Sequence, residues 1–254
     1  MKALILAGGY ATRLRPLTDD RAKPLLPVAG RPIVDRILDK IVEVDGVDEV
    51  HLVTNARFAP DFDEWARDRD VKVHDDGTTS NEDRLGAIGD IAFVADRESW
   101  DGDDVLVVAG DNLFEFSLAE YVDFWREKDG SAIAVYEHPV PELVREYSVV
   151  ELDTDSRVIG FEEKPERPET NLIAIATYLY HRAHLALLHV YLADGNLPDQ
   201  PGNFIAWLHT RAQVYGYRFG GEWADIGNHA QLLEADNRYR RRAGLPERDQ
   251  YLLD

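Results

Sequence analysis

The sequence predicts an α/β fold with a doubly wound, mostly parallel sheet and a small antiparallel portion in its second half. Short apolar runs such as residues 3–7 and 104–109 alternate with segments of helical periodicity. Strands that are separated by helices pair in parallel. Three runs with strand character then follow closely on one another, at residues 147–153, 157–163 and 171–180. This close spacing is typical of antiparallel strands.

The first half of the chain alternates regularly between the two kinds of element. Ile33, Ile37 and Ile41 recur at helical spacing, whereas residues 104–109 are almost entirely apolar, as in a buried parallel strand. Strands are expected at residues 3–7, 49–54, 71–74, 104–109 and 131–137. Helices are expected at residues 32–44, 58–69, 85–95 and 118–128, with a turn-rich loop at 75–83.

The remaining elements close the domain. Helices are expected at residues 181–193 and 203–212, a strand at 214–219 and a closing helix at 229–242. The chain contains no internal repeat, low-complexity tract or linker. At 254 residues it is long enough to bury a sizeable core, and we expect a single domain over residues 1–254.

The composition excludes several kinds of site and partner. There are no cysteines, so disulfides and thiolate metal sites are excluded. The formal net charge is −20, with 29 Asp and 19 Glu against 22 Arg and 6 Lys. So acidic a chain is not expected to bind nucleic acid. Its self-repulsion requires screening, which indicates a salt-rich cytosol such as that of a haloarchaeon.

The sequence shows no sign of a targeting segment, and its acidic pairs are interpreted without a site. The apolar start at residues 3–7 is too short for a signal peptide or a membrane span, so we expect a cytoplasmic protein with no membrane partner. About a dozen residues follow the last predicted helix, so a second catalytic domain is not expected. The pairs Asp75–Asp76 and Asp103–Asp104 are interpreted as solvated turns.

The first predicted strand ends at a glycine turn that is surrounded by hydrogen-bond donors. Gly8 and Gly9 allow a sharp turn and a close approach of a ligand, and Thr12, Arg13 and Lys23 follow. A strand, a glycine turn and convergent donors suit a polyphosphate at the carboxyl end of a sheet. Neither the Walker pattern nor the dinucleotide-binding pattern GxGxxG is present.

Residues 6–18 and 23–28 resemble the signature of the sugar-1-phosphate nucleotidyltransferases, LxGGxGTRLxPLT followed by KPLLPV. Ala11 stands where that family usually has glycine, which narrows the geometry of the loop. The resemblance implies a Rossmann-like sheet. It also implies a nucleotide-binding half at about residues 1–130, with Leu6, Gly8, Gly9 and Thr12 among its contacts. A sugar-binding half with the closing helix is then expected at about residues 131–254.

Two aspartates stand where strands end. Asp111 follows the strand at 104–109, and a carboxylate at the carboxyl end of a parallel strand lies in the ligand crevice. Asp225 follows a later strand, within residues 222–227. Without the resemblance, a residue that caps the next helix would be the commoner explanation of Asp111. The resemblance implies that Asp111 and Asp225 are the metal ligands, and Mg²⁺ suits carboxylates combined with phosphate oxygens.

A lysine-containing motif marks the expected sugar side. Residues 161–165 resemble the Glu-Lys-Pro motif of the family, although by themselves they read as a solvated charge run. The resemblance implies that Glu163 accepts hydrogen bonds from sugar hydroxyls and that Lys164 binds the sugar phosphate. Asn112, Ser148 and Asn171 complete the implied sugar-phosphate contacts, with Ser148 in place of a family glycine.

The nucleobase is the least defined of the expected ligands. Residues 85–89 resemble the family segment that faces the base, so Leu85 and Gly86 are expected to contact the nucleotide. Ala87 and Ile88 replace the usual Thr-Ala, and the glutamine of bacterial thymidylyltransferases is missing. The choice of base therefore stays open.

The resemblance implies an enzyme that condenses a nucleoside triphosphate with a sugar 1-phosphate, releasing pyrophosphate. Arg13, Lys23, Asp111 and Asp225 are the implied catalytic residues, with Mg²⁺ as cofactor and a homo-oligomer as a possible assembly. A glucose-1-phosphate thymidylyltransferase-like activity is expected first. Mannose-1-phosphate guanylyltransferase and UTP-glucose-1-phosphate uridylyltransferase are the alternatives. A non-catalytic regulatory paralogue that binds nucleotide-sugar is an alternative of another class.

Overall fold

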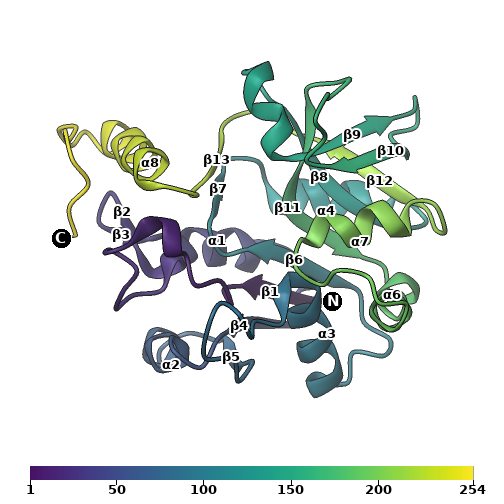
Figure 1. Cartoon of the computed structure of the whole chain (residues 1–254), viewed down its shortest axis with the longest axis horizontal. Helices are drawn as coiled ribbons and strands as arrows, with labels where there is room; N and C mark the ends of the chain where they lie inside the picture. Colours follow the sequence, from purple (N-terminus) through teal and green to yellow (C-terminus); the bar gives the residue numbers. More distant parts are fainter. Residues whose placement is uncertain (254) are drawn as a thin grey trace.

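The computed structural model describes residues 1–253, and within them nine strands form one central sheet (Figure 1). Its main path runs β10-β9-β11-β6-β1-β4-β5, and β8 lies between β11 and β12. These strands are β1 (Lys2–Leu6), β4 (Glu49–Thr54), β5 (Lys72–Asp75), β6 (Val105–Ala109), β8 (Ser131–Glu137), β9 (Ser148–Leu152), β10 (Val158–Glu163), β11 (Leu172–Tyr180) and β12 (Val214–Arg218).

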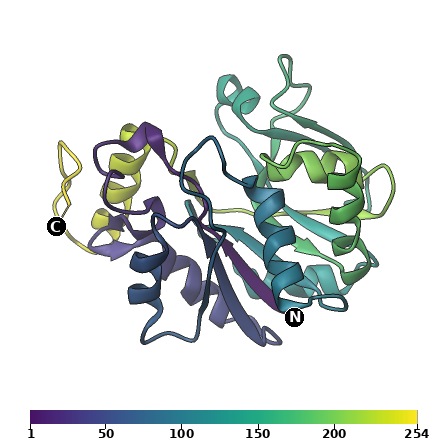
Figure 2. The same ribbon diagram turned by 60° about the horizontal axis from the view of Figure 1, so that its bottom comes forward.

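Within residues 1–253 there are eight α-helices, and all but the last pack on the faces of this sheet. They are α1 (Ile33–Val42), α2 (Ala59–Ala66), α3 (Gly86–Glu98), α4 (Leu118–Arg126), α5 (Arg182–Leu185), α6 (Leu187–Ala193), α7 (Pro201–Leu208) and α8 (His229–Arg242). The core on one face joins α1, α2 and α4, and the core on the other joins α3, α5, α6 and α7. Figure 2 shows α3 and α7 on the same side of the molecule.

The pairing of the strands confirms the predicted fold class. β1 pairs in parallel with β4 and β6, β4 with β5, and β8 with β12. Antiparallel pairs join β11 to β6, β8 and β9, and β9 to β10. The predicted antiparallel portion is therefore not a separate unit, because β11 hydrogen-bonds it into the central sheet.

Several short elements were not predicted. They are the strands β2 (Pro27–Val28), β3 (Arg31–Pro32), β7 (Asn112–Phe114) and β13 (Trp223–Asp225), and the 3₁₀ helices η1 (Thr12–Leu14), η2 (Lys23–Leu25) and η3 (Pro141–Glu146). β7 and β13 pair with each other across more than a hundred residues. The four strands have only two or three residues each, which is too short to show periodicity, and their tertiary pairing alone defines them.

Two predicted helices have different limits. The helix expected at residues 181–193 is divided at Ala186 into α5 and α6, which allows both Leu185 and Leu188 to reach the core. The helix expected at 203–212 begins earlier, at Pro201, and ends at Leu208. Proline suits the first turn of a helix because its missing N–H has no intrahelical partner there.

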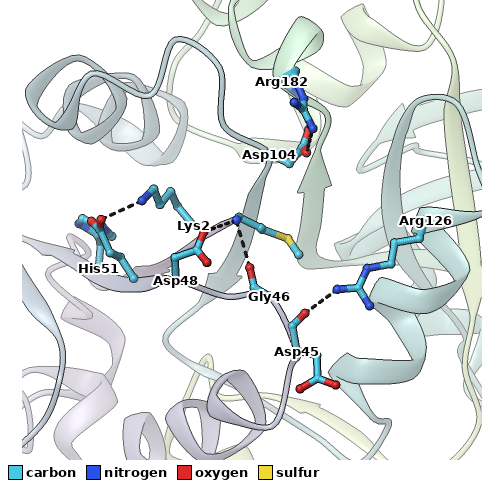
Figure 3. A network of polar contacts seen from close by, with 10 residues as sticks. Lys2, Asp45, Gly46, Asp48, His51, Asp104, Arg126 and Arg182 are labelled. Carbon is cyan, nitrogen blue, oxygen red and sulfur yellow. Dashed lines mark hydrogen bonds and ion pairs between the residues drawn. The ribbon is translucent and has the colours of Figure 1, made fainter.

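A polar network ties together the amino ends of the central strands (Figure 3). The amino group of Met1 donates to the carbonyl of Gly46 (3.1 Å) and to Asp48 (2.7 Å). Arg182 donates from its guanidinium (2.6 Å) and its backbone N–H (2.8 Å) to Asp104. Asp104 is only 9% exposed, so its interpretation as part of a solvated turn was wrong. This network lies at the opposite end of the strands from the glycine turn.

No helix within residues 1–253 is long and apolar enough to cross a membrane.

Candidate active site

A pocket of about 880 Å³ opens where β1 and β6 end, between the two halves of the chain. The glycine turn, the start of α3, the ends of β7 and β13, and the start of α7 surround it. Most of the predicted site residues line this pocket, namely Leu6, Gly8, Gly9, Thr12, Arg13, Lys23, Gly86, Asp111, Asn112, Ser148, Glu163, Lys164 and Asp225. The fold thus brings together motifs that are separated by more than two hundred residues.

Two predicted residues lie outside the lining of the pocket. Leu85 immediately precedes α3, and its Cβ lies 3.0 Å from where a Cβ on Gly89 would stand. The side-chain amide of Asn171 lies 3.4 Å from Glu137 Oε1 and 3.5 Å from the carbonyl of His138. In this structure Asn171 therefore joins the ends of β8 and β11.

The glycine turn and the start of α3 have strict steric requirements. A Cβ on Gly8 would lie 2.6 Å from Asp90 Oδ2. A Cβ on Gly86 would lie 2.7 Å from the backbone of Pro198 and Asp199, and Gly86 itself has φ of +79°. Because backbone carbonyls of that loop accept the first N–H groups of α3, Gly86 is required for packing within the protein. Ala11 adopts φ of +46°, the left-handed conformation that favours the family's glycine.

Lys23 and two aspartates form the charged centre of the pocket. The ammonium of Lys23 forms an ion pair with Asp111 and donates to the carbonyl of Ile226 (2.7 Å). Asp225 lies opposite Asn112 in the β7–β13 pair, so this small sheet places the second aspartate beside the first. Asn112 donates to Asp111 Oδ1 (2.9 Å). Trp223 donates its indole N–H to Asn112 Oδ1 (2.6 Å).

The two aspartates have opposite pKa shifts. Burial and the negative charge of Asp111 raise the pKa of Asp225 to about 6. Burial also acts to raise the pKa of Asp111, but the charge and hydrogen bond of Lys23 outweigh it and lower the pKa below its usual value. The Asp111 carboxylate is therefore stabilised in its ionised form by Lys23. Ionisation of Asp225 is instead opposed by its burial and by the charge of Asp111.

Arg13 supplies a second cation at the edge of this centre. Its side chain is exposed and lines the pocket, and its guanidinium lies 3.8 Å from where a Cβ on Gly227 would stand. Within residues 1–253 no carboxylate forms an ion pair with Arg13, although its charge acts to lower the pKa of Asp225. The guanidinium is thus available to an anion in the pocket.

The opposite wall carries Ser148, Glu163 and Lys164. Ser148 donates a hydrogen bond to Glu163 Oε2, and Lys164 Nζ lies 3.6 Å from Glu163 Oε1 and 3.3 Å from Gln200 Oε1. A Cβ on Gly202 would lie 2.3 Å from Glu163 Oε2, so glycine is required where α7 packs against this carboxylate. These contacts hold one carboxylate and one ammonium at the edge of the pocket.

Sequence analysis missed a buried carboxyl pair next to the glycine turn. Asp90 on α3 is 6% exposed, and Asp76 packs against it rather than standing in a solvated turn, so that interpretation of Asp76 was wrong. Burial and the charge of Asp76 raise the pKa of Asp90 to about 8. Asp90 Oδ1 and Asp76 Oδ2 have no hydrogen-bond partner within residues 1–253. Asp90 lies one helical turn after Gly86, a spacing that sequence analysis left unexamined.

We expect Asp90→Asn to gain stability relative to the wild type as the pH rises. The folded-state pKa of Asp90 is raised, so the protonated side chain favours folding below its ordinary pKa, and this contribution is lost as the pH rises through about 8. Asparagine does not titrate. The free energy of unfolding of the variant, relative to that of the wild type, should therefore increase by about 2 kcal/mol between pH 6 and pH 9. Urea unfolding at the two pH values measures this. Asp63→Asn, an exposed change on α2, is the control, and an equal difference between Asp90→Asn and the wild type at both pH values would contradict the pKa assignment.

The fold and the pocket together define a class of protein. An open α/β sheet carries a glycine turn, paired carboxylates and two cations at the carboxyl ends of its strands. This arrangement is typical of proteins that bind phosphate groups. Comparison of the sequence with family models is consistent with this class. Residues 2–242 match the model of the nucleotidyl transferase family, and the chain belongs to that family.

Similar proteins come from several organisms. The chain is 30% identical over 239 residues to the bifunctional protein GlmU of Methanocaldococcus jannaschii, covering 94% of this chain and 54% of that protein. It is 28% identical over 260 residues to glucose-1-phosphate adenylyltransferase of Clostridium novyi, covering 93% of this chain and 66% of that protein. The chain therefore spans about half to two thirds of the length of these relatives.

A solved structure shows the same fold. The Bacillus anthracis protein assigned as a glucose-1-phosphate thymidylyltransferase, crystallised in complex with sucrose, superimposes with a TM-score of 0.77. The comparison covers 94% of this chain and 95% of that one at 24% sequence identity. It confirms the predicted Rossmann-like arrangement of the sheet.

Proposed function

We propose that the protein transfers a nucleotidyl group from a nucleoside triphosphate to a sugar 1-phosphate, releasing pyrophosphate. The observation that supports this most directly is the convergence of the cations Arg13, Lys23 and Lys164 with the carboxylates Asp111 and Asp225 on one pocket. Both reactants carry several negative charges, and a pocket that brings them together requires such cations. Membership of the nucleotidyl transferase family supports the reaction type.

The residues divide naturally between the two reactants. Arg13 lies beside the glycine turn, where it is free to contact the triphosphate and to stabilise the charge that develops on the departing pyrophosphate. Lys164 lies on the opposite wall, where it is placed to orient the phosphate of the sugar. That phosphate is ionised at neutral pH, so its oxygen attacks the α-phosphorus without a general base. Catalysis then rests on positioning and electrostatics.

Asp111 and Asp225 fit a divalent cation by the chemistry of their donors. Burial and the negative charge of Asp111 make ionisation of Asp225 unfavourable, and a hard cation between the two carboxylates would remove that repulsion. Mg²⁺ bound there would neutralise charge on the phosphate oxygens during transfer. Lys23 holds Asp111 ionised, and the Trp223–Asn112–Asp111 hydrogen bonds orient it.

For the substrate pair we propose glucose 1-phosphate and dTTP. Glucose 1-phosphate appears in the names of both the Clostridium relative and the Bacillus structure, whereas the nucleotide in those names differs. ATP is thus an alternative to dTTP, together with GTP and UTP. Asp90, Arg84 and Asp199, near Gly86, are charged residues that line this part of the pocket and that a base there would meet.

Pyrophosphate release over a matrix of nucleoside triphosphates and sugar 1-phosphates tests the proposal, with Mg²⁺ and molar KCl present. Release that requires one particular pair would establish the activity and identify both substrates. If no pair releases pyrophosphate while nucleotide-sugar still binds in calorimetry, the protein is a regulatory paralogue. An Asp111→Asn variant controls for contaminating activity.

We also propose that the protein is adapted to high salt. The formal net charge of −20 creates repulsion that is strongest in dilute buffer. The melting temperature is therefore expected to rise from dilute to molar KCl, and most of the rise should occur as the Debye length falls below about 10 Å. Thermal unfolding across a KCl series measures this. Maximal stability in dilute buffer would contradict the adaptation.

A further inference from the structure

Two fully buried histidines lie side by side at the edge of the central sheet that is formed by β4 and β5. His51 on β4 is 0% exposed and His74 on β5 is 1% exposed. In the parallel register His51 pairs with Lys72 and Val53 with His74, so both rings lie on the same face of the sheet. The rings stack with their centroids 5.2 Å apart, and Trp100 packs edge-on against His51. This cluster lies outside the pocket described above.

Carboxylates stand at both ends of the histidine pair. Glu49 Oε2 lies 3.1 Å from Nε2 of His51, and Nδ1 of His51 lies 2.9 Å from Nε2 of His74. Glu98, the last residue of α3, places Oε1 3.9 Å from Nδ1 of His74, while its Oε2 pairs with Lys72. The side chain of Glu98 is only 12% exposed. Four side chains thus form a continuous row, Glu49–His51–His74–Glu98, in which the two histidines are fully buried, Glu98 is largely buried and Glu49 is exposed.

Hydrogen bonds alone do not satisfy all the ring nitrogens of the two histidines in this row. A carboxylate only accepts, so Glu49 takes the N–H from Nε2 of His51, and Nδ1 of that neutral ring becomes an acceptor. His74 must then donate from Nε2, which leaves Nδ1 of His74 as an acceptor facing the Glu98 carboxylate. That nitrogen is buried and has no hydrogen-bond partner within residues 1–253. Two buried acceptors that face each other without a donor are unfavourable.

We propose that His51, His74 and Glu98 bind a divalent transition metal of the Zn²⁺ type. One ligand atom from each of the three side chains lies within 4.8 Å of the others. Ligands of tetrahedral zinc lie about 3.3 Å apart, given metal–ligand bonds of about 2.0–2.1 Å. The 2.9 Å between Nδ1 of His51 and Nε2 of His74 is already close to that value. Glu98 then closes the site by side-chain rotation, and water completes the four-coordinate shell.

The metal resolves the unsatisfied contact. It would replace the proton between the two rings, and that proton would move to Nδ1 of His74, so that this nitrogen is no longer an acceptor facing the Glu98 carboxylate. Glu49 becomes the outer carboxylate that orients His51, an arrangement common around metal-bound imidazole, and Lys72 supports Glu98 in the same way. Burial lowers the pKa values of His51 and of His74, the latter to about 4, which keeps both rings in the neutral form that binds metals.

The site connects α3 to the edge of the sheet. Glu98 ends the helix that begins at Gly86 in the pocket, and His51 and His74 belong to β4 and β5. A bound ion would therefore stabilise the packing of α3 without contacting the substrates. This inference is independent of the proposed reaction, because its ligands and its readout are separate from catalysis.

Binding of Co²⁺ to the purified chain, followed by its visible absorption and by displacement with Zn²⁺, tests the site. Excess Mg²⁺ occupies the carboxylates of the pocket during the titration. We expect one equivalent of Co²⁺ to give the intense bands of four-coordinate cobalt with imidazole ligands, and Zn²⁺ to remove them and to raise the melting temperature. Glu98→Gln keeps the shape of the helix end and is expected to weaken binding at least tenfold, with a larger loss in His74→Gln.

The matched control is His189→Gln, which removes the exposed histidine of α6 that pairs with Asp96 of α3 (3.0 Å). It is expected to leave the cobalt spectrum and the zinc-induced stabilisation unchanged. Glu98→Gln keeps the test valid if His74→Gln does not fold. Absence of the four-coordinate spectrum in the wild type, or a spectrum that persists in both Glu98→Gln and His74→Gln, would overturn the proposal.

Discussion

Replacement of Arg13 by alanine is expected to lower kcat by about three orders of magnitude or more while leaving the fold unchanged. Its guanidinium is exposed, lines the pocket and has no carboxylate partner within residues 1–253, so its removal costs the folded protein little. In the proposed reaction it stabilises negative charge on the departing pyrophosphate, and arginines in that role contribute about a factor of 10³–10⁵. Steady-state kinetics of pyrophosphate release measure the loss.

Arg15→Ala is the matched control for this experiment. Arg15 is also exposed and pairs with Asp19 (3.4 Å), but it does not line the pocket. Its replacement should leave kcat within a small factor of the wild type. Arg13→Lys should recover part of the activity, because it restores the charge without the planar guanidinium. A folded Arg13→Ala protein with nearly normal turnover would refute the proposed role.

Asp225→Asn is expected to reduce kcat about a hundredfold or more and to shift the Mg²⁺ titration to higher concentrations. Asparagine keeps the shape of the side chain but removes the charge that would share the cation with Asp111. Loss of a few kcal/mol of electrostatic stabilisation in the transition state corresponds to this change in rate. Turnover measured over a Mg²⁺ series separates the loss of affinity from the loss of rate.

The stability of Asp225→Asn distinguishes a metal ligand from a structural residue. Burial and the charge of Asp111 raise the pKa of Asp225 to about 6, so ionisation of Asp225 above that pH works against the metal-free fold. Without added metal the variant should therefore be at least as stable as the wild type at pH 7.5. Asp123→Asn on α4, which is exposed and remote, controls for the change in net charge. An unchanged Mg²⁺ titration would remove Asp225 from the proposed site.

The long strands and helices were predictable because their apolar periodicity is local. The runs that became β1, β4 and β6, and the helical spacing of Ile33, Ile37 and Ile41, depend only on neighbours in the sequence. The pairing of β7 with β13 was not predictable, because two three-residue strands meet across more than a hundred residues. Yet this pairing is what places Asp225 beside Asn112 and Asp111.

The same contrast between local patterns and tertiary contacts holds for individual side chains. Arg13, Lys23, Asp111 and Asp225 were found from their motifs, and the structure brings them to one pocket, where their roles remain predictions. Asp76 and Asp104 look like ordinary acidic turn residues, since nothing local indicates that Asp90 and Arg182 will cover them.

By itself, then, the sequence determined the α/β class, the order of the main elements and the family, because these depend on local periodicity and on contiguous motifs. Only the tertiary structure decided which polar groups are buried together. The Lys23–Asp111 ion pair, the Asp76–Asp90 pair and the His51–His74–Glu98 cluster each join residues from different parts of the fold that no local pattern in the sequence links. Their pKa shifts arise from desolvation and neighbouring charge, and both are properties of the packed structure.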